Sequence, residues 1–129
     1  NIPLIRLSEA YLNAAEAAVK LGDNEKAVAY LNPIVARANP ARSVEGTVLT
    51  LDAVLTERRK ELVAEGHRMY DVMRNGGTVK RVQLSDKAIS KTKHDTKYME
   101  YDWTFYQIVL PIPKGEMNAN PNMKQNPGY

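Results

Sequence analysis

The chain contains no cysteine and only two histidines among its 129 residues. The missing thiols exclude disulfide bonds, thiol catalysis and thiolate metal sites. Neither His67 nor His94 has a companion at the spacing of a zinc site, and no phosphate-binding loop, dinucleotide motif or G-x-S-x-G motif occurs. The sequence therefore predicts no catalytic residue, no metal and no cofactor.

Long hydrophobic runs and strongly basic blocks are also missing. No apolar run approaches the about 20 residues that span a membrane. No signal peptide is visible and a helical pattern begins at once, so we expect a piece of a longer protein. The net charge of +3 is spread along the chain, which excludes nucleic acid as a partner. The balance of hydrophobic and charged residues predicts one domain over residues 1–129.

Two helices are predicted in the first third of the chain. Apolar residues recur at steps of three and four over residues 3–21, and Gly22 is a natural helix stop. A second helix is predicted over residues 25–39, capped by Asp23 or its neighbour. The short connection makes the pair an antiparallel, tetratricopeptide-like hairpin. Pro33 lies inside the second helix, where it should cause a kink or a local break.

A long third helix is predicted over residues 51–74, after a Thr50 cap and before the Asn-Gly-Gly sequence at 75–77. Gly66 lies within this helix and marks either a weak point or a close contact. Residues 78–84 stay ambiguous between strand and loop.

The remainder of the chain changes character. Residues 85–97 are polar and predict a surface loop, and residues 98–110 have strand character. The last nineteen residues hold four prolines and four asparagines, which predict turns and extended segments. The fold class expected is therefore mainly α: a tetratricopeptide-like helical hairpin plus a long third helix, with a short strand and an extended Pro/Asn-rich C-terminal tail.

Two charged residues, Arg58 and Glu65, fall on the apolar stripe of the predicted third helix. An isolated buried charge is costly, so we expect both to be buried in a structural network. The expected partners are Arg59, Glu61, Arg68 or the returning tail. A ligand or catalytic site at these residues is the alternative. The spacing of Glu57, Glu61 and Glu65 also fits a metal site or an acid–base pair, but the interleaved arginines favour a salt-bridged face.

Aromatic residues gather before the tail. Five of the nine aromatic residues lie within nine positions: Tyr98, Tyr101, Trp103, Phe105 and Tyr106. In a strand, Tyr101, Trp103 and Phe105 would point to one face. Flat rings there suit stacking on a sugar, which makes Tyr101 and Trp103 the candidate ligand-binding residues. Docking of the rings on the helices is the alternative.

Three stretches of the chain together resemble the SusD/RagB family of outer-membrane nutrient-binding lipoproteins. The stretch RLSEAYLNAAEA at residues 6–17 is similar to an alanine-rich helix of that family. Residues 57–76 resemble its signature E-R-R-x-E-L-x-x-E-G-x-R-x-x-D-x-x-R-x-G. The end of the chain, from LPIP at 110–113 to QNPGY at 125–129, is similar to the usual close of family members.

The resemblance implies a mostly helical protein held as a lipoprotein on the cell surface, at the outer membrane of Bacteroidetes-type bacteria. It implies a TonB-dependent, SusC-like transporter as partner and an oligosaccharide or peptide as cargo. The missing N-terminal region of the parent would be a further contact of this chain. On this basis we expect non-catalytic binding of nutrient, most often glycan, with this chain mainly a scaffold. A generic tetratricopeptide-like adaptor for protein interactions is the alternative.

Overall fold

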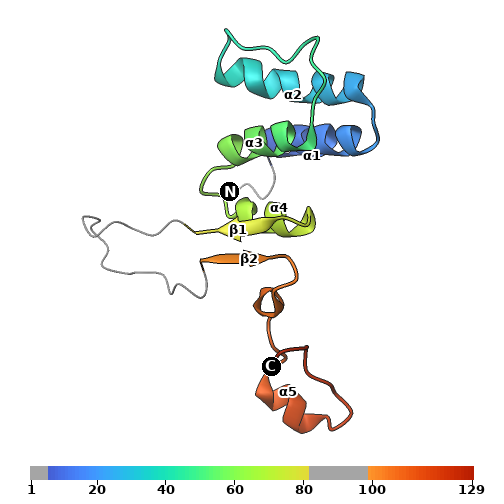
Figure 1. The fold of residues 1–129 in the computed structure, drawn as a ribbon, viewed down its shortest axis with the longest axis vertical. Helices are drawn as coiled ribbons and strands as arrows, with labels where there is room; N and C mark the ends of the chain where they lie inside the picture. Colours follow the sequence, from blue (N-terminus) through green and yellow to red (C-terminus); the bar gives the residue numbers. More distant parts are fainter. Residues whose placement is uncertain (1–5, 82–98) are drawn as a thin grey trace, which may run out of the picture. The chain divides into compact units, whose positions relative to one another are not determined.

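The computed structural model describes residues 6–81 and 99–129 of the chain (Figure 1). These residues divide into two compact units, Asn1–Arg68 and Met69–Tyr129, and each is described by itself. The fold is mainly α-helical, as predicted. In chain order its elements are α1 (Leu7–Lys20), α2 (Asn24–Ala38), α3 (Leu51–Glu61), α4 (His67–Arg74), β1 (Thr78–Lys80), β2 (Glu100–Asp102), the short 3-10 helix η2 (Tyr106–Ile108) and α5 (Lys114–Ala119).

The turn between α1 and α2 is made by Gly22, whose φ of 76° is the left-handed conformation that glycine adopts at no steric cost. The Gly22 N–H donates to the carbonyl of Val19, and the Asp23 N–H donates to that of Ala18. These two bonds are the Schellman arrangement that ends a helix. The Asp23 side chain then accepts a hydrogen bond from the backbone N–H of Lys26 and caps α2. The predicted stop and cap are both confirmed.

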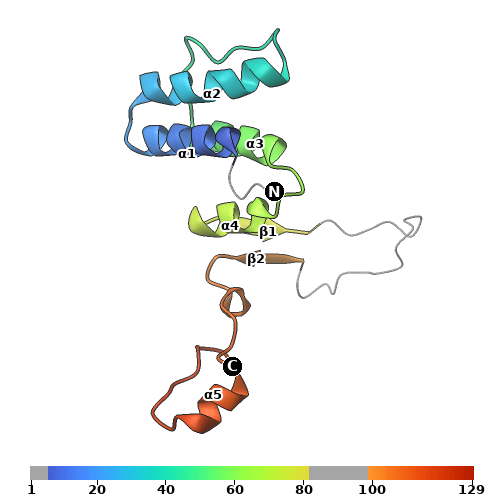
Figure 2. The ribbon, with the colours of Figure 1, turned by 180° about the vertical axis from the view of Figure 1, so that it is seen from behind.

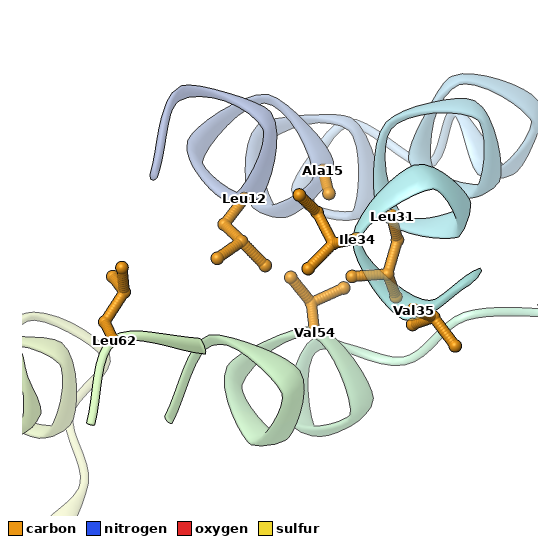
Figure 3. Packing of buried hydrophobic residues seen from close by; sticks show 7 residues of the cluster. All are labelled: Leu12, Ala15, Leu31, Ile34, Val35, Val54 and Leu62. Atoms are coloured by element: carbon orange, nitrogen blue, oxygen red, sulfur yellow. The ribbon is translucent and has the colours of Figure 1, made fainter. Parts of the chain in front are cut away.

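The hairpin and α3 enclose the apolar core of the first unit (Figure 3). In both ribbon views α2 runs alongside α1, and α3 lies on the α1 side of the pair (Figures 1 and 2). Each fully buried aliphatic side chain of such a core stabilises the fold by about 1.5–3 kcal/mol. The cluster consists of Leu12, Ala15, Leu31, Ile34, Val35, Val54 and Leu62.

The loop between α2 and α3 is fastened to α2 by two asparagine side chains. Asn24 donates to the carbonyl of Thr47 and accepts from the backbone N–H of Leu49. Asn32 accepts from the backbone N–H of Val44. Val44 and Leu49 are thereby held against the core. Helix α2 itself continues through Pro33, so the expected local break there is absent.

The predicted third helix is not one helix, and this is a correction. It begins as expected at Thr50, whose hydroxyl accepts from the Ala53 N–H, but α3 ends at Glu61 and α4 starts at His67. Ala64 and Gly66 between them have φ values of 64° and 79°. A right-handed helix cannot continue through left-handed residues. The weak point predicted at Gly66 is therefore a full break.

The second unit holds a two-stranded antiparallel sheet in which Val79 lies opposite Tyr101. The strand expected over residues 98–110 is shorter than predicted, because only Glu100–Asp102 is strand. The Asp102 carboxylate accepts hydrogen bonds from the N–H and hydroxyl of Thr104, which turn the chain away from the sheet. Expectations for Tyr98 and for the loop at 85–97 fall outside the described residues.

The C-terminal tail contains a helix that composition did not predict. Pro113 supplies the fixed φ that suits a helix start, and its carbonyl accepts from the N–H groups of Glu116 and Met117. Acidic Glu116 in the first turn complements the helix dipole. Beyond α5 the chain returns to residues 109–112, where the Tyr129 hydroxyl donates to the carbonyl of Val109 at 3.0 Å.

Candidate functional site

The second unit contains a hollow of about 370 Å³, which we call the aromatic pocket. Its size lies within the range of small-molecule sites, about 300–1,000 Å³. It combines apolar side chains, two aromatic rings, one amide and one guanidinium. Its described lining residues are Met69, Arg81, Tyr101, Phe105, Gln107 and Ile108.

The strand pair places Arg81 and Tyr101 together. Val79 lies opposite Tyr101, and Arg81 follows Val79 by two positions, which brings it to the same face of the sheet. The Arg81 backbone N–H continues the pairing by donating to the carbonyl of Met99 at 2.8 Å. The Arg81 guanidinium carbon then lies 5.3 Å from the centre of the Tyr101 ring, a cation–π distance.

Aromatic rings run from the pocket wall into the tail. The ring of Phe105 lies 5.4 Å from that of Tyr101 and 5.2 Å from that of Tyr106, and Tyr106 meets Tyr129 at 5.2 Å. Offset and edge-on contacts at these distances each contribute about 0.5–1.5 kcal/mol beyond burial. The glycine before the terminal residue makes this contact possible, since a Cβ on Gly128 would lie 2.6 Å from the Tyr106 ring. The tail therefore braces the aromatic pocket.

The structure separates the two candidate ligand-binding residues. Tyr101 lines the aromatic pocket, whereas Trp103 is not among its described lining residues and is 57% exposed. The expected alternation stops because the strand ends at Asp102. Trp103 instead lies beside Gly76, where a Cβ would come within 3.7 Å of its indole nitrogen. Sequence reasoning missed Arg81, whose only signal was its place in the ambiguous stretch 78–84.

A charge network in the first unit centres on Glu61, whose side chain is only 8% exposed. Its two carboxylate oxygens accept from Arg6 Nη1 at 2.6 Å and from Arg37 Nη2 at 2.5 Å. Burial raises the pKa of Glu61, but the hydrogen bond from Arg6 and the charge of Arg37 outweigh burial and hold the pKa below its ordinary value. Arg6 and Arg37 were not predicted members, since they come from the residue before α1 and from α2.

The remaining expected members of the network occupy different environments. Arg58 is buried, and its Nη1 donates to the Asn13 amide oxygen at 2.7 Å, with Glu9 3.8 Å away. The expected burial of Glu65 is wrong: its side chain is 40% exposed and pairs with Arg6 at 2.7 Å. The apolar stripe ends with α3, so Glu65 and the exposed Arg68 no longer lie on it.

The third carboxylate of the series, Glu57, is paired with Lys60 at 2.7 Å and with Arg42 at 3.1 Å. Burial raises its pKa, and the two hydrogen-bonded cations lower it by more, so the net pKa lies below the ordinary value. Within residues 6–81 and 99–129 no three potential ligands gather as a metal site. No helix in that part of the chain is both long and apolar enough to cross a membrane.

A second hollow of about 400 Å³ lies between α1 and α2, where Arg6, Tyr11, Pro33 and Arg37 contribute to its lining. Both of its cations already contact the Glu61 carboxylate. The aromatic pocket differs, because its cation Arg81 has no acidic partner within residues 6–81 and 99–129. The aromatic pocket is therefore the better candidate for a ligand site.

Comparison with known proteins identifies related sequences. The model of the SusD family matches residues 1–129. The starch-binding protein SusD of Bacteroides thetaiotaomicron is 35% identical over 132 residues, which cover all of this chain and 22% of that protein. The chain thus spans about a quarter of the length of the relatives it matches.

Solved structures agree with this relationship. A crystal structure from Bacteroides vulgatus, provisionally named as a sugar-binding protein, superposes with a TM-score of 0.86 at 76% identity. The match covers 99% of this chain and 29% of that one. A SusD superfamily protein from the same organism superposes with a TM-score of 0.80 at 48% identity, over 98% of this chain and 27% of that one.

Proposed function

Because the chain belongs to the SusD family, we propose that it is the C-terminal part of a non-catalytic protein that binds nutrient, most often glycan, at the cell surface. The whole protein would be an outer-membrane lipoprotein that delivers its oligosaccharide or peptide cargo to a TonB-dependent, SusC-like transporter. The names of two relatives, starch-binding and provisionally sugar-binding, support glycan over peptide.

The aromatic pocket is the observation that carries the binding proposal. Tyr101 and Phe105 offer ring faces for the apolar side of a sugar, and the Gln107 amide offers a donor and an acceptor for hydroxyl groups. A few polar groups among apolar walls is the usual make-up of small-molecule sites. We therefore place the contribution of this chain to glycan binding at the aromatic pocket, with Tyr101 as its central ring.

The state of the carboxylates supports binding over hydrolysis. A glycosidase acid needs a carboxyl group whose pKa is raised. Glu57 and Glu61 have lowered pKa values and are paired with cations, which favours a structural role for both. We propose the same role for the network of Arg58, Glu61, Glu65 and Arg68, which would hold the helices of the scaffold together.

The binding energies expected for the aromatic pocket favour a chain that is mainly scaffold and holds only part of the glycan site. One stacked ring contributes about 1 kcal/mol, whereas even millimolar affinity needs about 4 kcal/mol. The six described lining residues of the aromatic pocket come from one small unit, and sugar sites gather groups from several elements. The rest of the protein would supply the remaining contacts.

The proposal is tested by calorimetric titration of one panel of oligosaccharides into this chain and into the longer protein that contains it. We expect binding by the longer protein and at least about tenfold weaker binding by this chain. Tyr101→Ala in the longer protein should weaken binding about fivefold, the equivalent of roughly 1 kcal/mol.

Two further variants complete the test, one of Tyr70 and one of Trp103. Tyr70 belongs to the same unit, is exposed and does not line the pocket, so Tyr70→Ala should leave the affinity unchanged. Trp103→Ala reports whether the exposed indole takes part in binding. Equal micromolar binding by both proteins would move the whole site into this chain. Absence of binding to every oligosaccharide, or hydrolysis of any, would refute the proposed function.

A further inference from the structure

The charge of the aromatic pocket has a specific origin. Arg81 is the one charged residue among the described residues that line it. The side chain is exposed, lies over the Tyr101 ring and has no acidic partner within residues 6–81 and 99–129. The contrast with the preceding residue is clear, because Lys80 is paired with Glu100 at 3.1 Å. Within the part of the chain that the structure describes, the pocket therefore presents an unneutralised cation beside the Tyr101 ring.

We infer that the aromatic pocket binds an acidic sugar, a residue that carries a carboxylate or a sulfate, through Arg81. This inference rests on the proposed function and names the ligand class of the same site. A guanidinium offers paired N–H donors that match both oxygens of a carboxylate or two of a sulfate. The Tyr101 ring beneath it restricts the guanidinium, so less side-chain freedom is lost on binding.

The other lining residues fit the remainder of such a sugar. Phe105 is tilted 43° from Tyr101, so the two rings form a corner and not a flat stack. A sugar ring that packs in this corner keeps its apolar face dry and directs its substituents outward. Gln107 can then contact hydroxyl groups. A neutral sugar would use the rings and the amide but would leave the guanidinium without a counter-charge.

The test is a nuclear magnetic resonance titration, observed on the sugar, with the longer protein that contains this chain; the method detects millimolar binding. The probes are methyl glucoside, methyl glucuronide and methyl glucoside 6-sulfate, which differ only at the sixth carbon. We expect the charged sugars to bind about tenfold more tightly than the neutral one, the difference typical of one charge-assisted hydrogen-bonding pair. The carboxylate and sulfate arms decide which anion the site prefers.

Arg81→Gln should abolish the preference for charged sugars, so that the three sugars bind with similar affinity. Lys80→Gln is the matched control, since it removes the same charge one position away on the opposite face of the strand. Titrations with sodium acetate and sodium sulfate distinguish binding of an acidic sugar from binding of a simple anion.

Equal affinity for all three sugars, an unchanged preference in Arg81→Gln, or equal binding of acetate and glucuronide would overturn the inference and leave glycan binding intact. Absence of binding to any sugar, by this chain and by the longer protein, would remove the proposed function and the inference with it.

Discussion

Arg6 and Glu61 lie 55 positions apart in the sequence, yet Arg6 Nη1 is 2.6 Å from Glu61 Oε1. A second Arg6 nitrogen also donates to the backbone carbonyl of Glu61, so this arginine satisfies an orphan carbonyl near the end of α3. The same guanidinium reaches Glu65 beyond that end. One side chain at the start of α1 therefore fixes the C-terminus of α3.

Glu61→Gln should lower the free energy of unfolding by about 1–3 kcal/mol, because it removes charge from hydrogen bonds with two arginines around a nearly buried carboxylate. Urea denaturation followed by circular dichroism measures the change. Glu65→Gln is the control. Its carboxylate is 40% exposed, so its loss should cost less than about 0.5 kcal/mol. Equal effects of the two substitutions would contradict the central position of Glu61.

Stability should fall in acid, and the sign follows from the lowered pKa values of Glu57 and Glu61. Near the ordinary pKa of 4.5 the folded protein binds fewer protons at these carboxylates than the unfolded chain. Their contribution is present above pH 4.5 and is lost as the pH falls through the lowered folded values. Urea denaturation at a series of pH values between about 3 and about 7 tests this dependence of stability on pH. Glu61→Gln should show a shallower dependence on pH than the unmodified chain.

Arg58→Ala should destabilise the first unit by about 3–5 kcal/mol, because it removes a buried cation that bonds to Asn13 and lies near Glu9. Arg59 is the next residue, has the same chemistry and is exposed. Arg59→Ala should therefore change the free energy of unfolding by less than about 0.5 kcal/mol. A cost for Arg58→Ala as small as that of Arg59→Ala would show that its burial contributes nothing.

Two glycine substitutions should have opposite signs. Gly66 has a φ of 79° in the break between α3 and α4, so Gly66→Ala should destabilise the protein by about 1 kcal/mol or more. Gly115 lies inside α5 with open space around it. Gly115→Ala should stabilise α5 by about 0.5–1 kcal/mol. Thermal melts of both variants compare the two effects, and stabilisation by Gly66→Ala would mean that α3 and α4 form one helix.

Local signals in the sequence were sufficient for the hairpin and insufficient for the site. Gly22, Asp23 and Thr50 act on neighbouring backbone groups, so their roles as stop and caps could be predicted from short stretches. The aromatic pocket depends on the antiparallel register that brings Arg81 to Tyr101 across the chain. No periodicity within either segment encodes that register.

The incorrect predictions of one long third helix and of a buried Glu65 have the same physical cause. In the sequence, the apolar stripe that steps by three and four continues through residues 62–66. In the structure, the left-handed conformation of Ala64 ends the helix and the stripe with it. Alanine is the best helix former, so nothing in its identity signals that conformation. Glu65 consequently leaves the buried face, and Arg6, far away in the sequence, becomes its partner.

The tail is closed by a side chain that imitates a peptide group. The Gln125 amide accepts from the backbone N–H of Ile112 at 2.8 Å and donates to its carbonyl at 2.9 Å. Only an amide side chain presents an acceptor and a donor in this way, and a carboxylate of the same shape would meet the Ile112 carbonyl with repulsion. A glutamate at position 125, the product of deamidation, would thus replace one hydrogen bond with repulsion and leave the contacts of Asn126 and Tyr129 to hold the tail against residues 109–112.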